Sequence, residues 1–506
     1  MRLSDLLREA GVSVRFGSNP EIRGVKIDSR QVNPGDLFLA LKGARDDGSR
    51  YAGEAIARGA AVVLSEGDTH VGSGSAIASA EVIPVPGLRS QVGGLLDAWY
   101  GHPAQDMLSV GITGTNGKST ITKLTASLFK AAGLKPISLG TISYEVGDEA
   151  LPSDLTTPGP DAFFKMLSQG RDKGCEALVM EVSSHALDQD RIKGVDFDRA
   201  VFTNLTRDHM DYHKDFEDYY QAKKKLFTDY LLPDGMAILN LDSSYGARLA
   251  AELSCPRITF SRGEAGLSAP AGSPKAAVST VADVLLTDTR LTLSGTEFEI
   301  TYRGVPHRFS SRLVGSINLE NLLAVVTLGL SLGFERDTIA LGISEVTVIG
   351  RNQVFGLPGG AFAVVDYAHT PDALERVLMS LRPMTKGNLV CLFGCGGDRD
   401  RTKRPIMGNI AVTLADRVCL TSDNPRTEDP KAILEEIQGG IKDKGRVTVL
   451  ADRKQSIKAA LDSLREGDCL LIAGKGHEDY QILGKEKRHF SDQEEILSWA
   501  EARRGA

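Results

Sequence analysis

The sequence predicts an α/β protein of three domains, and three observations support this fold class. The chain has 506 residues, which is too long for a single hydrophobic core. Its 42% hydrophobic and 25% charged residues are typical of a globular protein. Apolar strand-like runs alternate with helix-like segments, as they do in parallel βαβ units. We therefore expect three α/β domains, at residues 1–92, 93–348 and 349–506.

The first domain contains short strand-like runs separated by turns. Asn33-Pro34-Gly35-Asp36 is a turn sequence, because proline and glycine favour tight turns. An Ala- and Gly-rich helix follows it, and then the strand Ala61–Leu64. The domain ends near the Gly-, Ser- and Ala-rich stretch from Val71 to Ala80, or a little later near Pro86.

The central domain begins with a strand, a glycine-rich turn and a helix. Met107–Thr113 is the strand, and Lys118–Ala132 is the helix because its apolar residues recur on one helical face. Gly133 lies where a helix C-cap belongs. Arg262–Ser279 is rich in Gly, Ala, Ser and Pro, so we expect a surface excursion there. Further strands are expected at Ala177–Met180, Ala200–Leu205 and Met236–Leu241.

After Gly350-Arg351 the alternation of strands and helices becomes regular, which predicts a Rossmann-like sheet. In parallel sheets, ligands bind beyond the carboxyl ends of the strands. Groups of polar residues and glycines follow several expected strands, so we expect a binding site at that edge. The expected strands are Phe362–Val365, Leu389–Phe393, Arg417–Leu420, Val447–Leu450 and Cys469–Ala473, and the groups are Asp366–His369, Gly394–Asp400, Asp423–Arg426 and Gly474–Glu478.

Composition and charge argue against several classes of protein. A net charge of −7 argues against a general nucleic-acid binder. Met1–Glu9 lacks the continuous apolar core of a signal peptide. The longest uncharged apolar stretch, Asn321–Phe334, is shorter than the roughly 18 residues of a membrane span, so we expect a buried helix there. The six cysteines show no disulfide spacing, so we expect reduced thiols and a cytoplasmic protein.

A glycine-rich loop joins the first strand to the first helix of the central domain and predicts a nucleotide site. Backbone N–H groups at a helix N-terminus suit phosphate oxygens, Lys118 suits the β- and γ-phosphates of ATP, and the Ser119 hydroxyl suits Mg²⁺. The strict phosphate-loop pattern has glycine where this chain has Ile112, but the strand and helix flank the loop correctly. The expected ATP-binding residues of the loop are Gly114, Thr115, Asn116, Gly117, Lys118, Ser119 and Thr120.

The loop Gly114–Ser119 resembles the GTNGK[ST] loop of the Mur ligase family and of the related folylpolyglutamate synthetases. The resemblance to the Mur ligases extends over nearly the whole chain. It implies an ATP-dependent ligase that converts a carboxylate to an acyl phosphate and joins it to an amine in peptidoglycan synthesis. It also implies a UDP-binding N-terminal domain, a central ATPase-like domain and an amino-acid-binding C-terminal domain. We expect a monomer that acts on small molecules.

Two motifs of the central domain carry expected metal ligands. Glu181 follows the strand Ala177–Met180, and Glu181–Leu187 is similar to the family's EVSSHAL motif, in which this glutamate binds a metal. His209 and His213 are four residues apart and would form a zinc pair on a helix face, but no cysteine ligand or H-E-x-x-H pattern accompanies them. The resemblance makes His209 a Mg²⁺ ligand instead, and His213 is expected to be polar or structural.

Lys223, Lys224 and Lys225 form a basic run, and a solvated helix face explains two of them. The resemblance matches Lys223 to the family lysine that CO₂ carbamylates, which turns a cation into an anionic oxygen ligand for a second Mg²⁺. The expected catalytic residues are Lys118, Lys223 and His209, and the expected metal ligands are Ser119, Glu181, His209 and the carbamate on Lys223.

The resemblance also assigns residues to the two nucleotide substrates. Asp28–Arg30 resembles the family segment near the uridine diphosphate, although by itself it is only a turn. A guanidinium such as that of Arg351 suits a phosphate. The residues expected to bind the UDP-linked substrate are Ser29, Thr156, Thr157, Ser184, Gln189 and Arg191, and the further residues expected to bind ATP are Asn321, Arg351, Asp366 and His369.

Asp423-Asn424-Pro425-Arg426 follows an expected strand and indicates the amine substrate. In the family, DNPR marks the members that add meso-2,6-diaminopimelate to UDP-N-acetylmuramoyl-L-alanyl-D-glutamate, while lysine-adding relatives lack the arginine. A guanidinium can hold the extra carboxylate of diaminopimelate with two hydrogen bonds. A plain Asx–Pro turn explains Asn424 and Pro425 equally well. The expected diaminopimelate-binding residues are Arg399, Asp423, Asn424, Pro425, Arg426, Gly474 and Glu478, with Glu478 at the distal ammonium group.

Two other functions remain open on the sequence. One is a folylpolyglutamate synthetase-like ligase, which has no reason to carry Asp28–Arg30 in a separate domain or Asp423–Arg426 in the last one. The other is a P-loop ATPase that switches or moves a partner without forming bonds. ATP turnover that needs both a carboxylate and an amine would distinguish a ligase from such an ATPase.

Overall fold

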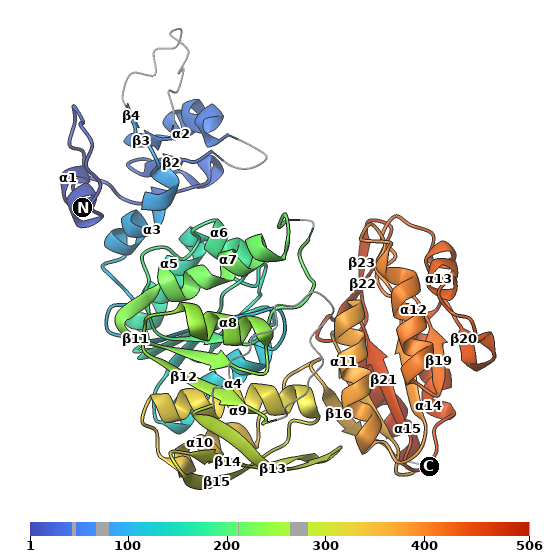
Figure 1. Ribbon diagram of the computed structural model, residues 1–506. Helices are drawn as coiled ribbons and strands as arrows, with labels where there is room; N and C mark the ends of the chain where they lie inside the picture. Colours follow the sequence, from blue (N-terminus) through green and yellow to red (C-terminus); the bar gives the residue numbers. More distant parts are fainter. Residues whose placement is uncertain (43–46, 67–79, 211, 264–281, 505–506) are drawn as a thin grey trace.

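The computed structural model describes residues 1–42, 47–66, 80–210, 212–263 and 282–504, and it contains three large sheets that follow one another along the chain (Figure 1). Helices cover the sheets, and most neighbouring strands are parallel. The predicted fold class is therefore confirmed. The predicted stretches Val71–Ala80 and Arg262–Ser279 lie almost entirely outside the described residues.

The N-terminal sheet has four parallel strands in the order β1-β2-β3-β4. The turn Asn33–Asp36 precedes β2, and Gly35 has φ +91°, a backbone conformation that favours glycine. Helix α3 packs on α1 and on α5 of the central part, so it links the two parts and crosses residue 92. The elements are α1 (Leu3–Glu9), β1 (Val25–Lys26), β2 (Leu37–Ala40), α2 (Ala52–Ala57), β3 (Val62–Ser65), β4 (Glu81–Pro84) and α3 (Leu88–Trp99), with 3₁₀ turns at Ser29–Gln31 and Gly48–Tyr51.

The central sheet has 11 strands in the order β15-β14-β13-β12-β11-β10-β5-β9-β6-β7-β8. Its middle strands are parallel and apolar because both faces are covered by helices. The antiparallel strands at the two edges are not predicted by the sequence pattern. The strands are β5 (Leu108–Thr113), β6 (Pro136–Leu139), β7 (Tyr144–Val146), β8 (Glu149–Leu151), β9 (Ala177–Glu181), β10 (Phe197–Phe202), β11 (Leu231–Asn240), β12 (Arg257–Ser261), β13 (Val284–Thr292), β14 (Gly295–Tyr302) and β15 (Val305–Ser311).

Two groups of helices cover this sheet. Helices α4, α9 and α10 share one core with it, and α5 and α7 share the other. Gly133 follows the C-cap of α4 with φ +81°, as predicted, and the uncharged run after Asn321 lies in the buried helix α9, also as predicted. The helices are α4 (Lys118–Ala131), α5 (Pro160–Asp172), α6 (Ser184–Asp188), α7 (Phe216–Thr228), α8 (Ser244–Glu252), α9 (Ser316–Ser331) and α10 (Arg336–Ser344).

The C-terminal sheet has six strands in the order β16-β17-β21-β18-β19-β20, and only the edge strand β16 is antiparallel. All five predicted strands are present, and four of them are largely buried, whereas β20 at the edge of the sheet is mostly exposed. The elements are β16 (Gln353–Gly356), β17 (Phe362–Asp366), α11 (Pro371–Leu381), β18 (Leu389–Phe393), α12 (Lys403–Leu414), β19 (Arg417–Leu420), α13 (Pro430–Gln438), β20 (Val447–Val449), α14 (Arg453–Asp462), β21 (Cys469–Ala473), the hairpin β22 (Tyr480–Leu483) and β23 (Glu486–His489), and α15 (Asp492–Arg504), with 3₁₀ turns at Arg382–Met384 and Lys444–Arg446.

Two expectations from the sequence concern the state of the cysteines and the length of the apolar helices. All six cysteines are free thiols, as predicted. In the described part of the chain, none of the helices combines the length and the apolar character that crossing a bilayer requires.

Candidate active site

The loop between β5 and α4 takes a shape that favours glycine at two positions. Gly114 has φ +144° and Gly117 has φ +93°. A Cβ atom at Gly114 would lie 1.9 Å from Thr203 Oγ1, and one at Gly117 would lie 2.4 Å from Asn321 Oδ1. The predicted loop is therefore packed tightly between the residues that follow β10 and helix α9.

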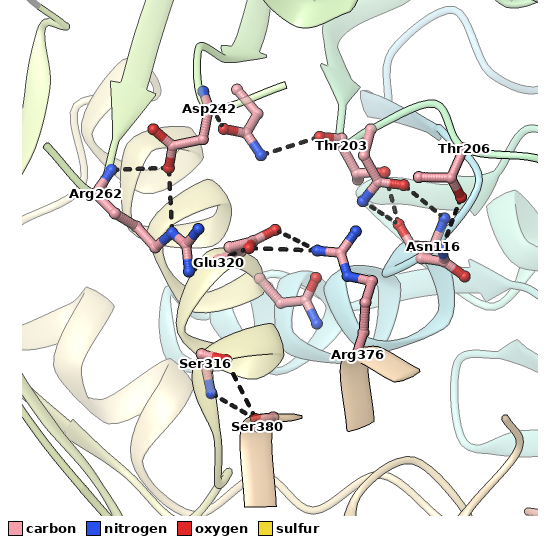
Figure 2. A network of polar contacts seen from close by, with 12 residues as sticks. Asn116, Thr203, Thr206, Asp242, Arg262, Ser316, Glu320, Arg376 and Ser380 are labelled. Carbon is pink, nitrogen blue, oxygen red and sulfur yellow. Dashed lines mark hydrogen bonds and ion pairs between the residues drawn. The ribbon is translucent and has the colours of Figure 1, made fainter. Parts of the chain in front are cut away.

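Hydrogen bonds from the segment after β10 fix this loop (Figure 2). Asn204 accepts from the Thr115 N–H through its carbonyl at 2.9 Å and from the Asn116 N–H through Oδ1 at 3.0 Å. Thr203 Oγ1 donates to the Asn116 carbonyl at 2.6 Å, and Asn116 Nδ2 donates to Thr206 Oγ1 at 3.2 Å. The loop backbone is thus held in place before any phosphate arrives.

Lys118 is the first residue of α4, and its side chain folds back over the loop. Its Nζ donates to the carbonyls of Gly114 at 2.9 Å and Thr115 at 2.8 Å. Burial lowers the pKa of Lys118, and the carboxylates of Glu181 and Asp208 oppose this shift. An ammonium at the N-terminus of a 14-residue helix forms a positive site that suits phosphate oxygens.

Glu181 ends β9, the strand beside β5, and its side chain is buried. Its Oε1 accepts from the Thr141 N–H at 2.7 Å, and its Oε2 accepts from Thr141 Oγ1 at 3.1 Å. Gly140 leaves room for the carboxylate, since a Cβ atom there would lie 2.4 Å from Glu181 Oε1. The structure therefore places a carboxylate at the strand end where the sequence predicts one.

Lys223 lies on α7 and points inward, unlike its neighbours Lys224 and Lys225. Only 1% of its surface is exposed, and its Nζ donates to the Gly114 carbonyl at 2.8 Å and lies 4.6 Å from the centre of the Tyr219 ring. Burial lowers the pKa of Lys223 well below its usual value, and the nearby charge of Lys118 adds to this. Its amine is therefore closer to the neutral, nucleophilic form than that of an exposed lysine.

The two candidate metal histidines lie in different surroundings. His209 has φ +56° and its ring packs edge-on against His185, with centroids 4.9 Å apart. His213 is buried, and its ring nitrogens lie 2.9 Å from Ser184 Oγ and 3.1 Å from Asp218 Oδ2. The zinc pair would need His209 and His213 on one face of a helix. The described residues around His209 form turns instead, so that interpretation is wrong. The structural role expected for His213 fits its two polar contacts.

Most of the residues predicted for the UDP-linked substrate gather near Glu181. Thr157 Oγ1 donates to the Glu181 carbonyl at 2.8 Å. Arg191 donates to the Thr157 carbonyl at 3.3 Å and to Gln189 Oε1 at 2.8 Å. The structure also places Thr156 Oγ1 3.1 Å from Thr141 Oγ1 and Ser184 Oγ 2.9 Å from the His213 ring.

Ser29 is the exception among these residues, since it lies in the N-terminal lobe, which Figure 1 shows apart from the C-terminal end of the chain. It belongs to a 3₁₀ turn that the Asp28 side chain caps. Its Oγ donates to Glu54 Oε2 at 2.9 Å.

A pocket lies between the central and C-terminal sheets. Asp366 ends β17, and its carboxylate accepts from the Asn352 N–H at 2.7 Å and the Ala368 N–H at 2.8 Å. Burial raises the pKa of Asp366. The Arg351 guanidinium lies 4.5 Å from the centre of the Tyr367 ring. The pocket brings together the predicted residues Thr115, Asn116, Gly117, Thr120, Asn321, Arg351, Asp366 and His369.

Gly114, Lys118 and Ser119, the predicted ATP residues that do not line this pocket, belong to the same loop and helix start as Thr115, Asn116, Gly117 and Thr120, which do. Ser119 Oγ accepts a long hydrogen bond of 3.5 Å from Arg351 Nη2, so the phosphate loop and the C-terminal domain approach each other here. The His369 ring lies 2.8 Å from the Tyr367 carbonyl, and burial lowers the pKa of His369.

Side chains of α9 and α11 join the two domains beside the pocket (Figure 2). Glu320 lies between two arginines, with Oε1 3.4 Å from Arg262 Nη1 and Oε2 3.2 Å from Arg376 Nη2. Ser380 Oγ accepts from the Ser316 N–H at 2.9 Å. The polar contacts hold α11, which follows His369 and carries part of the pocket wall, against the central domain.

The loops after β19 and β21 bring together residues predicted for the amine substrate. Asn424 Nδ2 donates to Glu478 Oε2 at 2.9 Å. A Cβ atom at Gly474, which has φ +114°, would lie 3.3 Å from Asp423 Oδ2. Behind these loops, the buried guanidinium of Arg453 donates to the Ser422 and Ala473 carbonyls at 3.3 Å and 3.2 Å. The two strand ends are therefore fixed next to each other.

Arg426 follows Pro425 and has φ +53°, which few residues other than glycine adopt. Its N–H donates to the Ile482 carbonyl at 3.1 Å, so the hairpin β22–β23 supports it. A Cβ atom at Gly396 would lie 2.9 Å from Arg426 Nη1 and 3.7 Å from the Cγ atom of Arg399, which is exposed. Two arginines thus flank one glycine at the mouth of this site.

Sequence reasoning missed several residues at these sites. The sequence could have pointed to Lys475, because it lies within the glycine-rich group Gly474–Glu478 beyond a buried strand. Tyr367 lies within the group Asp366–His369 in the same way. No signal points to Glu320 and Arg376, because their pairing joins two different domains.

Comparison with known proteins agrees with this geometry. Residues 112–329 match the Mur ligase middle domain, residues 350–476 match the Mur ligase glutamate ligase domain, and residues 21–100 match the Mur ligase family catalytic domain. The chain is 42% identical to a protein of Geobacter metallireducens named UDP-N-acetylmuramoyl-L-alanyl-D-glutamate--2,6-diaminopimelate ligase, with 98% of each chain covered. The chain belongs to the Mur ligase family. As a Mur ligase, it is an ATP-dependent enzyme that forms amide bonds.

Two further similarities cover this Mur ligase from end to end. A protein of the same name from Gloeobacter violaceus is 43% identical over 100% of this chain and 99% of its own. A solved structure titled as that ligase superposes with a TM-score of 0.70 at 30% identity and covers 100% of both chains. A P-loop ATPase that forms no bonds, one of the two alternatives left open by the sequence, is therefore rejected.

Proposed function

We propose that this Mur ligase joins 2,6-diaminopimelate to UDP-N-acetylmuramoyl-L-alanyl-D-glutamate in peptidoglycan precursor synthesis. The observation that carries the proposal is the end-to-end similarity to ligases of that name. The C-terminal site supports it, because the carboxylates of Asp423 and Glu478 and the guanidinium of Arg426 all lie near enough to Tyr480 for their charges to act on its hydroxyl group. The far end of diaminopimelate carries an ammonium and a carboxylate, which such a site can hold.

In the first step, the substrate carboxylate attacks the γ-phosphorus of ATP, giving an acyl phosphate and ADP. Positioning and charge neutralisation supply most of the catalysis in such a transfer. Lys118 at the N-terminus of α4 and Arg351 across the pocket are the cations for the phosphates. The loop from Gly114 to Thr120 wraps the phosphates, and Asn321, Asp366 and His369 hold the rest of ATP.

The oxygen atoms of Ser119 and Glu181 beside the loop are of the kind that Mg²⁺ prefers, and a bound Mg²⁺ would neutralise charge on the phosphates. Ser119, Glu181 and His209 are the proposed ligands, and a carbamate on Lys223 is the proposed ligand for a second ion. Among the residues that the structure describes, no three His, Cys, Asp or Glu side chains gather at one point. The chemistry of Lys223 supports the carbamate, because a buried amine with a lowered pKa can react with CO₂.

In the second step, the amine of diaminopimelate attacks the acyl phosphate, the amide C–N bond forms, and inorganic phosphate leaves. Asn424, Pro425, Gly474 and Arg399 are proposed to shape the amine site around Asp423, Arg426 and Glu478. We assign the amine site to residues 349–506, the ATP site to residues 93–348 and the uridine site to residues 1–92. Closure of these domains brings the amine to the acyl phosphate and excludes water.

The UDP-linked substrate is proposed to run from Ser29 in the N-terminal domain to the central residues Thr156, Thr157, Ser184, Gln189 and Arg191. These central residues lie beside Glu181, so the substrate carboxylate can reach the phosphate loop. We propose that the enzyme works as a monomer in the cytoplasm, and its six free thiols suit a reducing compartment.

The test is to incubate the enzyme with ATP, Mg²⁺ and UDP-N-acetylmuramoyl-L-alanyl-D-glutamate, together with one of several diamino acids. Product mass and ADP release are measured for meso-2,6-diaminopimelate, L-lysine and L-ornithine. We expect a UDP-tripeptide with diaminopimelate and little product with the other two. Preference for L-lysine, or ADP release without an amide product, would contradict the proposal.

A further inference from the structure

Lys475 is a fully buried lysine at the centre of the amine site. It follows β21, and its side chain is 0% exposed. Its Nζ lies 3.4 Å from Glu478 Oε2 and 3.6 Å from Asp423 Oδ1, and it donates to Asn424 Oδ1 at 3.3 Å. A buried ammonium is costly unless it is paired, so this position requires the neighbouring carboxylates.

The ammonium also decides how the Asn424 side chain is turned. Lysine only donates hydrogen bonds, so it must face the Oδ1 of Asn424, which also accepts from the Ile482 N–H at 2.9 Å. Nδ2 is then forced toward Glu478, where it donates to Oε2 at 2.9 Å. Both donors hold the same oxygen of Glu478. Lys475 thereby fixes the orientation of this carboxylate.

The charges of the cluster add to a value that suits one cation. Asp423 and Glu478 are negative and Lys475 is positive, so the three side chains carry one net negative charge. Two of them are partly exposed, with side-chain exposures of 10% for Asp423 and 16% for Glu478. A single ammonium from a ligand would complete the neutralisation.

We infer that Lys475 is the positioning residue that sets specificity for the distal ammonium group of the amine substrate, acting through Glu478. The inference rests on the proposed function, since it takes the loops after β19 and β21 as the amine site. Without the ammonium of Lys475, the carboxylates of Asp423 and Glu478 lose their buried positive partner, and the Asn424 amide is free to turn. The enzyme then loses its grip on the distal ammonium, while the arginines still hold the distal carboxylate.

The test compares two substrates that differ only at the distal ammonium group. 2-Aminoheptanedioate has both carboxylates and the reacting amine of diaminopimelate but lacks the second amine. We measure kcat/KM for both with the wild-type enzyme and with Lys475→Met, which keeps the length of the side chain. The preference for diaminopimelate should fall about 10-fold or more, as expected when one partner of a desolvated charge pair is removed. The KM for ATP should stay unchanged.

Lys487→Met is the matched control, because Lys487 is exposed on β23 and lies 3.8 Å from the centre of the Tyr480 ring, near the same site. It should keep the wild-type preference. If Lys475→Met lowers kcat/KM for both substrates by the same factor, Lys475 has only a structural role and the inference fails. A wild-type enzyme that does not use diaminopimelate at all would instead overturn the proposed function.

A double-mutant cycle tests whether Lys475 acts through Glu478. In the Glu478→Gln background, Lys475→Met should change the substrate preference by less than about 2-fold. The double variant also restores the balance of charge, so it remains measurable if Lys475→Met alone does not fold. A further large loss of preference in the double variant would show that Lys475 acts by another route and would overturn the inference.

Discussion

Arg376 Nη2 lies 3.2 Å from Glu320 Oε2, so one ion pair joins α11 of the C-terminal domain to α9 of the central domain. Both side chains are more than half buried, with exposures of 28% and 13%. Arg376 also lines the pocket that holds the proposed ATP residues. The pair therefore couples the placement of the C-terminal domain to the shape of the nucleotide site (Figure 2).

Arg376→Met should raise the KM for ATP by about 3- to 10-fold, which corresponds to roughly 1 kcal/mol for a partly exposed pair. The KM for diaminopimelate should change little, because the proposed amine site lies on other loops of the C-terminal domain. Steady-state kinetics with each substrate varied in turn provides the measurement. Arg308→Met is the control, because it removes an exposed ion pair with Glu299 on β14 and β15. Equal effects of both variants would contradict the coupling.

Lys118→Ala should reduce acyl-phosphate formation by about 100-fold or more, because the ammonium at the N-terminus of α4 is a proposed cation for the phosphates. The assay is ADP release with the UDP-linked substrate and hydroxylamine, which traps the acyl phosphate without the amine substrate. Lys130→Ala changes an exposed lysine on the same helix and should have no effect. Near-normal turnover in a folded Lys118→Ala protein would refute the phosphate-loop assignment.

Lys223→Ala should lower turnover by about 100-fold or more, and added acetate or propionate should restore part of it by supplying oxygen ligands. The same substitution at Lys224, which pairs with Glu252 on the surface, should be tolerated. Nuclear magnetic resonance with ¹³C-bicarbonate should show a carbamate signal in the wild type that Lys223→Ala lacks. Wild-type turnover in the alanine variant would eliminate the proposed carbamate.

The pH dependence of the carbamate follows from the lowered pKa of Lys223. Only the neutral amine reacts with CO₂, and burial keeps the amine neutral down to a lower pH than in an exposed lysine. The carbamate signal should therefore persist at neutral pH and disappear as the pH falls through the lowered pKa. A signal that grows as the pH falls would have the wrong sign.

The sequence predicts the parallel strands and the phosphate loop because local patterns determine them. The runs that became β18 and β21 are buried and apolar throughout, and those that became β5 and β9 are largely so. Gly114 and Gly117 stand where backbone geometry demands glycine. The antiparallel edge strands β13 to β15 escape prediction because their exposed faces carry mixed polar residues. The pairing of Glu320 with Arg376 escapes it because the pairing depends on how two domains meet.

The proposed amine site also combines features that the sequence predicts with features that only the structure shows. The motif Asp423–Arg426 is visible in the sequence, and the strand-end rule places it correctly beside Gly474–Glu478. The left-handed backbone of Arg426 and the buried ammonium of Lys475 depend on the hairpin β22–β23 and on the packing between loops. Neither feature follows from a local sequence pattern, so the geometry around the motif could be seen only in the structure.

Arg426→Ala is the most discriminating test of the amine substrate. A guanidinium suits the extra carboxylate that separates diaminopimelate from lysine, and the Arg426 backbone is fixed by Ile482 at 3.1 Å. Removing one partner of a desolvated charge pair costs roughly 2–5 kcal/mol, so kcat/KM for diaminopimelate should fall by about 30-fold or more. The KM values for ATP and for the UDP-linked substrate should change little.

Two controls separate loss of the carboxylate contact from damage to the fold. L-Lysine has no distal carboxylate, so the residual turnover with L-lysine should stay the same in Arg426→Ala as in the wild type. Arg488→Ala removes an exposed arginine of β23 that pairs with Glu486, and it should behave as the wild type with both amines. An unchanged kcat/KM for diaminopimelate in Arg426→Ala would show that Arg426 does not bind the substrate. A parallel fall with L-lysine would instead mean that the substitution distorts the loop, since lysine offers that guanidinium no carboxylate to bind.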